Sequence, residues 1–437
     1  MISIIMPLYN AERFLEKTLQ SIANQTYRDY ELICIDDASS DLTAEIVKKA
    51  QLADKRIILL HNQERKGAAY SRNKAMRQAR GDYLAFLDGD DIFDEKMLEK
   101  AYICAKENLL DIIIFEYKHV NSEEIYKKQY IYRNNQFKEK YCRHSFSMSS
   151  LKAEEYCIWS NSPWNKLFRT EFIMENGLEF QSLSSSNDVF FVEMAFLLAK
   201  RIMSLNDNSV MVYARDHDTP TRISTNRDPM CTYYACRKIL EELSRRQLMK
   251  NLFEHCYLKC YFILLSGLSK AKSEKRKENF YHFLQQEGID KLKEIGGYPL
   301  LTSQVKNVFD RFEENYNTKW FENENLVVYL VRNERGRFQK LFDDYHNIYI
   351  WGAGNYGRSL IVGLNDIGLE VRGIMDSNAN LEGKPLANYN ILDVQKVNFE
   401  IIDLMIVAAR GAFNEVAQVL ERYNVRVIDL SDFIGIC

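Results

Sequence analysis

The first 120 residues alternate short apolar runs with amphipathic segments, and this alternation constrains the fold more than any other feature. Four runs have the composition of strands: residues 2–10 (ISIIMPLYN), 30–39 (YELICIDDAS), 56–62 (RIILLHN) and 82–91 (DYLAFLDGDD). Segments with helical periodicity follow them, at residues 11–25, 41–53, 67–79 and from about Asp94. The order βαβαβαβ predicts an α/β fold with a mostly parallel sheet covered by helices on both faces.

Polar residues stand where three of these predicted strands end. Tyr9 and Asn10 end the first strand, Asp36 and Asp37 end the second, and an acidic segment ends the fourth. In open parallel sheets ligands bind beyond the carboxyl ends of the strands. We therefore expect these side chains to converge at one edge of the sheet.

The segment YLAFLDGDDIF, residues 83–93, places Asp88, Asp90 and Asp91 within four positions. Like charges this close raise the free energy unless a positive charge lies among them. If the strand continued through Asp90, Asp88 and Asp90 would point to one side of the pleat, and Gly89 would allow a close approach. Two carboxylates suit Mg²⁺ or Mn²⁺ bound to a diphosphate. The alternative is a surface turn whose Asp residues cap the next helix.

Four segments in this order, IMPLYN, IDDASSD, KGAAYSRN and LDGDD, resemble the nucleotide-sugar-binding half of family 2 glycosyltransferases, which have the GT-A fold. The resemblance covers about the first 120 residues. More weakly, residues 162–173 (SPWNKLFRTEFI), 185–196 (SSNDVFFVEMAF) and 213–224 (YARDHDTPTRIS) resemble later segments of the bacterial surface-polysaccharide branch.

The resemblance implies roles for the residues at the strand ends. Pro7, Tyr9 and Glu12 would border the nucleobase pocket, and Asp37 would accept a hydrogen bond from the base, most often uracil. Arg72 would lie near the diphosphate, where a fork of N–H donors is suitable. Two alternatives remain open: Tyr9 as a packed aromatic at the edge, and Arg72 as a helix-surface ion pair.

The acidic segment would hold the cation. Asp88 would contact the ribose or a metal-bound water, and Asp90 would bind Mn²⁺ or Mg²⁺. Asp91 is either a second ligand or a helix cap.

Transfer needs a base that removes the proton of the attacking hydroxyl, because members of the family generally invert the anomeric centre in one displacement. Asp188 in SNDVFF matches the Asp of the family's EDxxF segment and is the candidate base. The sequence departs from the pattern at Asn187, which leaves Asp188 as the only carboxylate of this segment. The alternative is that Asp188 only caps the helix that follows.

Two further groups would lie on the acceptor or diphosphate side. Trp164 and Lys166 in PWNKLF would line the acceptor side or support the floor of the site. Arg215, His217 and Arg222 form a basic patch that could hold the diphosphate or an anionic acceptor, or could be a solvated loop.

The segment IYIWGAGNYGRSL, residues 348–360, combines a strand, a Gly-x-Gly-x-x-Gly turn and a helix. Gly352, Gly354 and Gly357 form the turn, and Asp376 ends the next strand where a ribose-binding acid would stand. About 90 residues remain, enough for half of a dinucleotide-binding fold. The segment resembles the small Rossmann-like modules of sugar-modifying enzymes and would bind a nucleotide or serve as a structural or oligomerising module.

These patterns divide the chain into a GT-A domain at 1–227, a helical segment at 228–345 with an amphipathic stretch at 236–256, and a Rossmann-like domain at 346–437. Cys231, Cys236, Cys256 and Cys260 do not have zinc-site spacing and are expected to be buried thiols. No apolar run reaches the length of a membrane span. The net charge of -3 favours no nucleic-acid partner.

We therefore predict a metal-dependent transferase that moves a sugar from a nucleotide-sugar to a glycan or lipid-linked acceptor. It would be cytoplasmic, with peripheral contact to the inner membrane face and self-association through the C-terminal domain as further expectations. Two alternatives stand beside it: an NAD-dependent sugar oxidoreductase built on the second glycine motif, and a non-catalytic scaffold.

Overall fold

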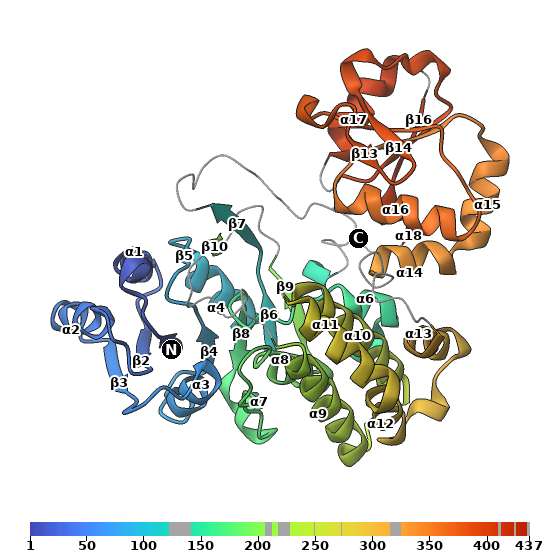
Figure 1. Ribbon diagram of the computed structural model, residues 1–437. Helices are drawn as coiled ribbons and strands as arrows, with labels where there is room; N and C mark the ends of the chain where they lie inside the picture. Colours follow the sequence, from blue (N-terminus) through green and yellow to red (C-terminus); the bar gives the residue numbers. More distant parts are fainter. Residues whose placement is uncertain are drawn as a thin grey trace. The chain divides into compact units, whose positions relative to one another are not determined.

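The computed structural model describes residues 1–121, 141–205, 212–216, 228–248, 250–271, 273–314, 325–409, 412–423 and 425–434. These residues form two compact units, one up to residue 314 and one from residue 325 (Figure 1). Among the described helices, none combines the length and the apolar character that crossing a bilayer requires.

The first unit is built on a mixed sheet whose described strands have the order β3-β2-β1-β4-β8-β6-β9. Its parallel part consists of β1 (Ile2–Leu8), β2 (Tyr30–Asp36), β3 (Ile57–His61) and β4 (Tyr83–Phe86). β8 (Lys166–Arg169) runs antiparallel to β4 and to β6 (Ile112–Ile114), and β9 (Ile202–Ser204) is parallel to β6. The predicted parallel sheet is confirmed, and the carboxyl ends of β1, β2 and β4 share one edge.

The helices between these strands follow the predicted periodicity. They are α1 (Glu12–Ala23), α2 (Thr43–Ala53), α3 (Ala68–Met76) and α4 (Met97–Glu107). In α1 the apolar positions Phe14, Leu15, Leu19 and Ile22 are buried, as expected for one amphipathic face. α6 (Ala153–Cys157), α7 (Thr170–Glu175) and α8 (Val189–Leu198) come later in the same unit.

A small second sheet lies after β4 in the same unit. Its order is β5-β10-β7, with β5 (Ile92–Phe93), β10 (Val212–Asp216) and β7 (Tyr117–Asn121). β5 begins one residue after Asp91, so the acidic segment connects the two sheets.

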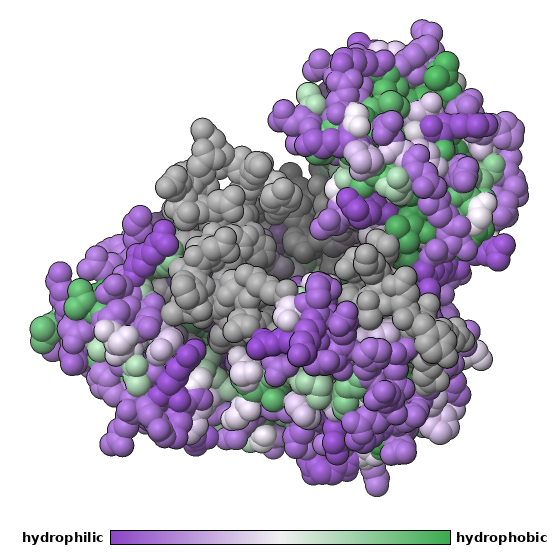
Figure 2. All heavy atoms as spheres, in the orientation of Figure 1, coloured by the Kyte–Doolittle hydropathy of each residue, from purple (hydrophilic) through white to green (hydrophobic). Residues whose placement is uncertain are grey.

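The helical segment begins with α9 (Met230–Arg246) and α10 (Lys250–Lys270) and continues through α11 (Glu274–Phe283), α12 (Ile289–Glu294) and α13 (Ser303–Glu314). The amphipathic stretch at 236–256 is two helices, because Gln247 has a left-handed backbone with φ of 50° that ends α9. The described surface on the face shown in Figure 2 is mostly hydrophilic, with apolar residues scattered across it. Cys231, Cys236, Cys256 and Cys260 are buried free thiols, as predicted.

The second unit contains α14 (Leu326–Asn333) and α15 (Arg335–Asp344), so the helical segment is shared between the two units. Its sheet has the order β13-β14-β12-β11-β15-β16 and is parallel except for β13 (Pro385–Leu386). The parallel strands are β11 (Ile348–Trp351), β12 (Gly373–Asp376), β14 (Tyr389–Asp393), β15 (Leu404–Val407) and β16 (Arg426–Asp429). β15 and β16 extend the sheet on the far side of β11, so the module is larger than the expected half-fold. Its described helices after β11 are α16 (Asn355–Asp366), α17 (Phe413–Leu420) and α18 (Leu430–Ile434).

A buried polar network joins α8 to α10 in the first unit. Glu193 on α8 is 1% exposed and accepts a hydrogen bond from the hydroxyl of Tyr156 on α6. Lys259 on α10 places its Nζ 3.6 Å from Glu193 Oε1 and donates to the carbonyl oxygens of Cys157 and Trp159 at 3.1 and 2.6 Å. Burial raises the pKa of Glu193, and the Lys259 charge opposes that rise. The helical segment is thereby fixed to the helix that follows Asp188.

We predict that Lys259→Met destabilises the first unit by about 3–5 kcal/mol, because it leaves the buried Glu193 carboxylate without its cation. Equilibrium denaturation measures this. Lys238→Met is the matched control: Lys238 on α9 is 45% exposed and lies 3.9 Å from Glu242, so its loss should change stability by less than about 1 kcal/mol. Equal effects of the two substitutions would contradict the prediction.

Candidate active site

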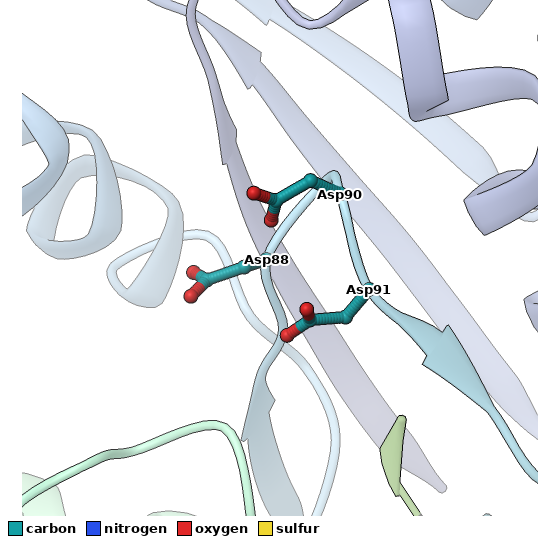
Figure 3. A group of neighbouring side chains, drawn as sticks. All are labelled: Asp88, Asp90 and Asp91. Carbon is teal, nitrogen blue, oxygen red and sulfur yellow. The ribbon is translucent and has the colours of Figure 1, made fainter. Parts of the chain in front are cut away.

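Three carboxylates gather where β4 ends. Asp88, Asp90 and Asp91 each offer an oxygen, and these oxygens lie within 4.8 Å of one another. Figure 3 shows the three side chains extending to the same side of the turn. The strand ends at Phe86, and the backbone N–H of Asp91 donates to the carbonyl oxygen of Asp88 at 3.4 Å. The expectation that a pleat brings Asp88 and Asp90 together is therefore wrong, because a tight turn does so.

The turn is packed firmly against the rest of the domain. A Cβ at Gly89 would lie 2.4 Å from Leu8 Cδ2, so any larger residue would require the Leu8 side chain to move. The hydroxyl of Thr18 on α1 donates to the carbonyl oxygen of Asp91 at 2.8 Å. Asp91 is 5% exposed, whereas Asp88 and Asp90 are partly buried. The acidic turn, residues 88–91, is thus held by contacts with β1 and α1.

Arg72 on α3 supplies the positive charge that the acidic turn needs. Its Nη2 donates to Asp88 Oδ1 at 2.9 Å, and the arginine is only 7% exposed. Burial raises the pKa of Asp88, the charges of Asp90 and Asp188 act in the same direction, and the Arg72 charge opposes them. The negative charges of Asp90 and Asp188 therefore both act on the Asp88 carboxylate.

The residues predicted to border a nucleobase lie in and just after β1, near the end of β2. The Arg65 guanidinium covers one face of the Tyr9 ring at 4.1 Å from its centroid. Glu12 accepts a hydrogen bond from the backbone N–H of Leu42 at 3.0 Å, and Pro7 is partly buried in β1. The loops after β1 and β2 are therefore tied to each other beside the Tyr9 ring.

Asp37 has a structural task that the sequence did not reveal. Its Oδ1 accepts hydrogen bonds from Asn62 Nδ2 at 2.7 Å and from the N–H of Lys66 at 2.9 Å, and its Oδ2 accepts from the N–H of Gly67 at 2.7 Å. Asp37 is 3% exposed. It fixes the loop between β3 and α3, which bears Arg65. A base contact by Asp37 remains a prediction.

Asp188 immediately precedes α8. It is partly buried, and its carboxylate makes no capping hydrogen bond to the described start of the helix. The alternative that Asp188 only caps α8 therefore lacks the hydrogen bond that defines an N-cap. Asn187, the departure from the family pattern, is 7% exposed, and its Oδ1 accepts a hydrogen bond from Arg72 Nη1 at 3.3 Å.

Of the predicted acceptor-side residues, Lys166 lies beneath the surface. It is 0% exposed and donates to the carbonyl oxygens of Ser160 and Ser162 at 2.9 and 2.6 Å and to Asn165 Oδ1 at 2.8 Å. Burial lowers its pKa to about 7. Lys166 therefore supports the 160–162 loop, and its place on the acceptor side or at the floor of the site stays a prediction.

The remaining predicted residues of this group are less fully placed. Trp164 is partly buried and packs edge-on against Tyr117 with ring centroids 4.7 Å apart. The backbone of Arg215 lies in β10, but its side chain is outside the described residues, as are His217 and Arg222.

The second glycine motif has the expected strand, turn and helix. Gly352 has a φ of 112°, and a Cβ at Gly357 would lie 1.9 Å from the Gly352 carbonyl oxygen. The Asp376 carboxylate accepts hydrogen bonds from the N–H of Ala353 at 2.8 Å and of Asn378 at 2.9 Å. Around a Cβ at Gly354 no other described atom lies within 4 Å. Asp376 thus holds the glycine turn, and nucleotide binding there remains a prediction.

The sheet, the acidic turn at its edge and the helices around it have the arrangement of a GT-A glycosyltransferase domain. Residues 3–157 match the model of glycosyl transferase family 2, and residues 344–427 match that of the C2185-like N-terminal domain. The chain also matches glycosyltransferase GlyG of Streptococcus pneumoniae, with 30% identity over 214 residues, 48% of this chain and 69% of GlyG. The chain therefore belongs to glycosyltransferase family 2, and it is a transferase enzyme.

Other relatives match over smaller parts of their own length. TarS of Staphylococcus aureus, a poly(ribitol-phosphate) β-N-acetylglucosaminyltransferase, is 28% identical over 244 residues, 55% of this chain and 40% of TarS. The Escherichia coli β-1,3-glucosyltransferase WfgD is 40% identical over 128 residues, 29% of this chain and 50% of WfgD. Residues 1–349 of S. aureus TarS, solved with UDP-GlcNAc, have a similar fold with a TM-score of 0.57 at 22% identity, over 72% of this chain and 91% of that one.

Sequence reasoning missed several residues that shape this site. Asn73 donates to and accepts from the backbone of Phe180, both at 2.8 Å, and Arg65 stacks on Tyr9. Asn73 stands beside Arg72 within the KGAAYSRN segment, so its position was a usable signal. Phe180 and Arg65 lie in segments without a recognisable pattern.

We predict that Asp37→Ala releases the loop between β3 and α3. Hydrogen bonds to a charged group contribute about 1.5–3 kcal/mol, so the Lys66 and Gly67 amides should exchange with deuterium roughly tenfold faster or more. Glu64→Gln is the control, because Glu64 lies in the same loop with an exposed side chain. Unchanged exchange in the Asp37 variant would refute the structural task assigned to this carboxylate.

Proposed function

We propose that the protein is a metal-dependent, inverting glycosyltransferase that moves a sugar from a nucleotide-sugar, most often a UDP-sugar in the family, to a hydroxyl of a glycan or lipid-linked acceptor. The observation that supports this most is the acidic turn beside Arg72 and Asp188 at the edge of the parallel sheet. The solved relative TarS was crystallised with UDP-GlcNAc, which favours a uridine donor.

The acidic turn fits a divalent cation. Its three carboxylates are hard oxygen donors, and Arg72 forms an ion pair with Asp88. Asp90 and Asp88 would hold Mn²⁺ or Mg²⁺, and the more deeply buried Asp91 has a carboxylate oxygen within 4.8 Å of theirs. Such an ion would stabilise the negative charge that develops on the departing diphosphate.

The chain's own residues would do the rest. Tyr9 and the loop held by Asp37 would border the base and ribose. Asp188 would accept the proton of the acceptor hydroxyl, since its carboxylate is not used for capping in the described structure. Trp164 would lie toward the acceptor.

The relatives support a place in cell-surface polysaccharide synthesis. TarS acts on poly(ribitol-phosphate), and WfgD acts on a diphosphoundecaprenol-linked sugar, according to their names. A lipid-linked acceptor of that kind would place this protein in the cytoplasm, in peripheral contact with the inner membrane face. Self-association through the second unit is a separate proposal.

We predict that Asp188→Asn keeps donor binding and lowers the rate of transfer by about 10²–10⁴-fold, the usual contribution of a general base. Donor affinity is measured by calorimetry and transfer by product formation. Glu179→Gln, at an exposed position in the preceding loop, serves as the control. Loss of both binding and transfer, or of neither, would remove Asp188 from the mechanism.

We also predict that UDP with Mn²⁺ raises the melting temperature and that chelator or Asp90→Asn abolishes the shift. Glu95→Gln, beside the acidic turn with an exposed side chain, should behave like the parent protein. NAD should have no effect on the first unit. Stabilisation by NAD alone, without an effect of UDP and Mn²⁺, would instead favour the oxidoreductase hypothesis.

A further inference from the structure

Arg72 connects two parts of the active site that are far apart in the sequence. It donates through Nη2 to Asp88, 16 residues away, and through Nη1 to Asn187, 115 residues away. Asp88 belongs to the acidic turn, and Asn187 is the direct neighbour of the candidate base Asp188. One buried guanidinium therefore contacts both the metal-binding segment and the base segment.

We propose that Arg72 and Asn187 form a positioning pair that fixes the acidic turn relative to Asp188. This proposal rests on the proposed function, because it assumes that the acidic turn holds the donor diphosphate and that Asp188 is the base. It assigns Arg72 a role different from direct contact with the diphosphate, and it gives a role to Asn187.

The surroundings of Arg72 hold its guanidinium in one place. The ring of Phe180 lies 5.2 Å from the guanidinium carbon. Phe180 stacks on Phe191 of α8, with centroids 4.1 Å apart and an interplanar angle of 12°. Asn73, next to Arg72 on α3, binds both backbone groups of Phe180 at 2.8 Å. The aromatic ring against the guanidinium is thus fixed to α3 and to α8 together.

The hydrogen bonds explain why arginine is needed. A guanidinium presents donors in a planar fork, so it can bind two acceptors at a fixed spacing, whereas a lysine ammonium acts as a point charge. The third guanidinium nitrogen of Arg72, Nε, is buried, and its N–H has no hydrogen-bond partner among the described residues. An unsatisfied buried donor costs free energy. This unfavourable contribution is present in a structure where the two Nη atoms bind Asp88 and Asn187.

Asn187 supplies the second acceptor without a charge. The guanidinium charge is therefore balanced by Asp88, its ion-pair partner. Asn187 would act through its carbonyl oxygen, so any residue of the same size with an acceptor at that atom should serve. An apolar residue of similar size should not.

The experiment compares Arg72→Lys, Asn187→Leu and the double variant in a transfer assay. We expect each single variant to lower kcat by about 10- to 100-fold, the size expected for a misplaced reacting group, while the donor KM changes by less than about threefold. The double variant should be no worse than either single variant, because one bridge is lost in all three. Asn187→Asp, which keeps the acceptor oxygen, should recover most of the kcat lost in Asn187→Leu.

Arg77→Lys is the matched control. Arg77 follows α3 directly, is 55% exposed and pairs with the exposed Glu179, so its substitution should leave kcat and melting temperature nearly unchanged. Melting temperatures of all variants show whether the protein remains folded. A purely structural role of Arg72 would lower the melting temperature and leave kcat per folded molecule unchanged, which would overturn the proposal.

Two other outcomes would also overturn it. A large rise in donor KM for Arg72→Lys, with kcat retained, would place Arg72 on the diphosphate. Additive losses in the double variant would mean that Arg72 and Asn187 act independently. Asp188→Asn, assayed in parallel, separates the two levels: an active Asp188→Asn variant refutes the proposed base, whereas an inactive one with normal Arg72 variants refutes the positioning pair alone.

Discussion

The ion pair between Arg72 and Asp88 is the interaction on which the architecture of the site depends. Parallel strands that end at one edge bring carboxylates from separate parts of the sequence together, and the turn after β4 adds three in four residues. Such a cluster is unfavourable without a cation. Arg72 reaches it because α3 packs beside β1, and its fork of donors also reaches the segment before α8. Arg72 thus both balances negative charge in the acidic turn and contacts the segment before α8.

Strand-end carboxylates also hold loops, in both units. Asp37 at the end of β2 binds two backbone N–H groups of the loop after β3. Asp376 at the end of β12 binds the N–H of Ala353 in the turn after β11. In each case an acid that sequence patterns assign to a nucleotide also holds the loop that would contact that nucleotide. Removing the carboxylate of Asp37 or Asp376 would therefore disturb the loop that it holds as well as any contact with a nucleotide.

The sequence predicted the first four strands and helices of the first unit well because their periodicity is local. The parallel strands and the buried face of α1 follow directly from the spacing of apolar residues. The acidic turn was assigned wrongly to a continuing strand, because the turn is held by contacts with residues distant in the sequence, such as the hydrogen bond from Thr18 to the carbonyl oxygen of Asp91. The end of α9 at Gln247 was missed for a similar reason, because glutamine gives no local signal for a left-handed backbone.

The site residues show the same limit. The residue types of Asp88, Asp90 and Asp188 were recognisable, but the burial of Lys166 and the bridge from Arg72 to Asn187 depend on tertiary contacts. The size of the second unit was also underestimated, because short strands such as β15 and β16 resemble any apolar run until they pair with β11 and with each other.

The helical segment takes part in the same arrangement. Asp188 precedes α8, and five residues later Glu193 binds Tyr156 and lies beside Lys259 of α10. A helix held at its start through Asn187 and in its middle through Glu193 has little freedom to slide or rotate. The candidate base is therefore positioned from two sides, by α3 of the sheet domain and by α10 of the helical segment. If Asp188 is the base, as proposed, α10 would take part in catalysis indirectly, because its Lys259 helps to hold the helix that presents Asp188 to the acidic turn.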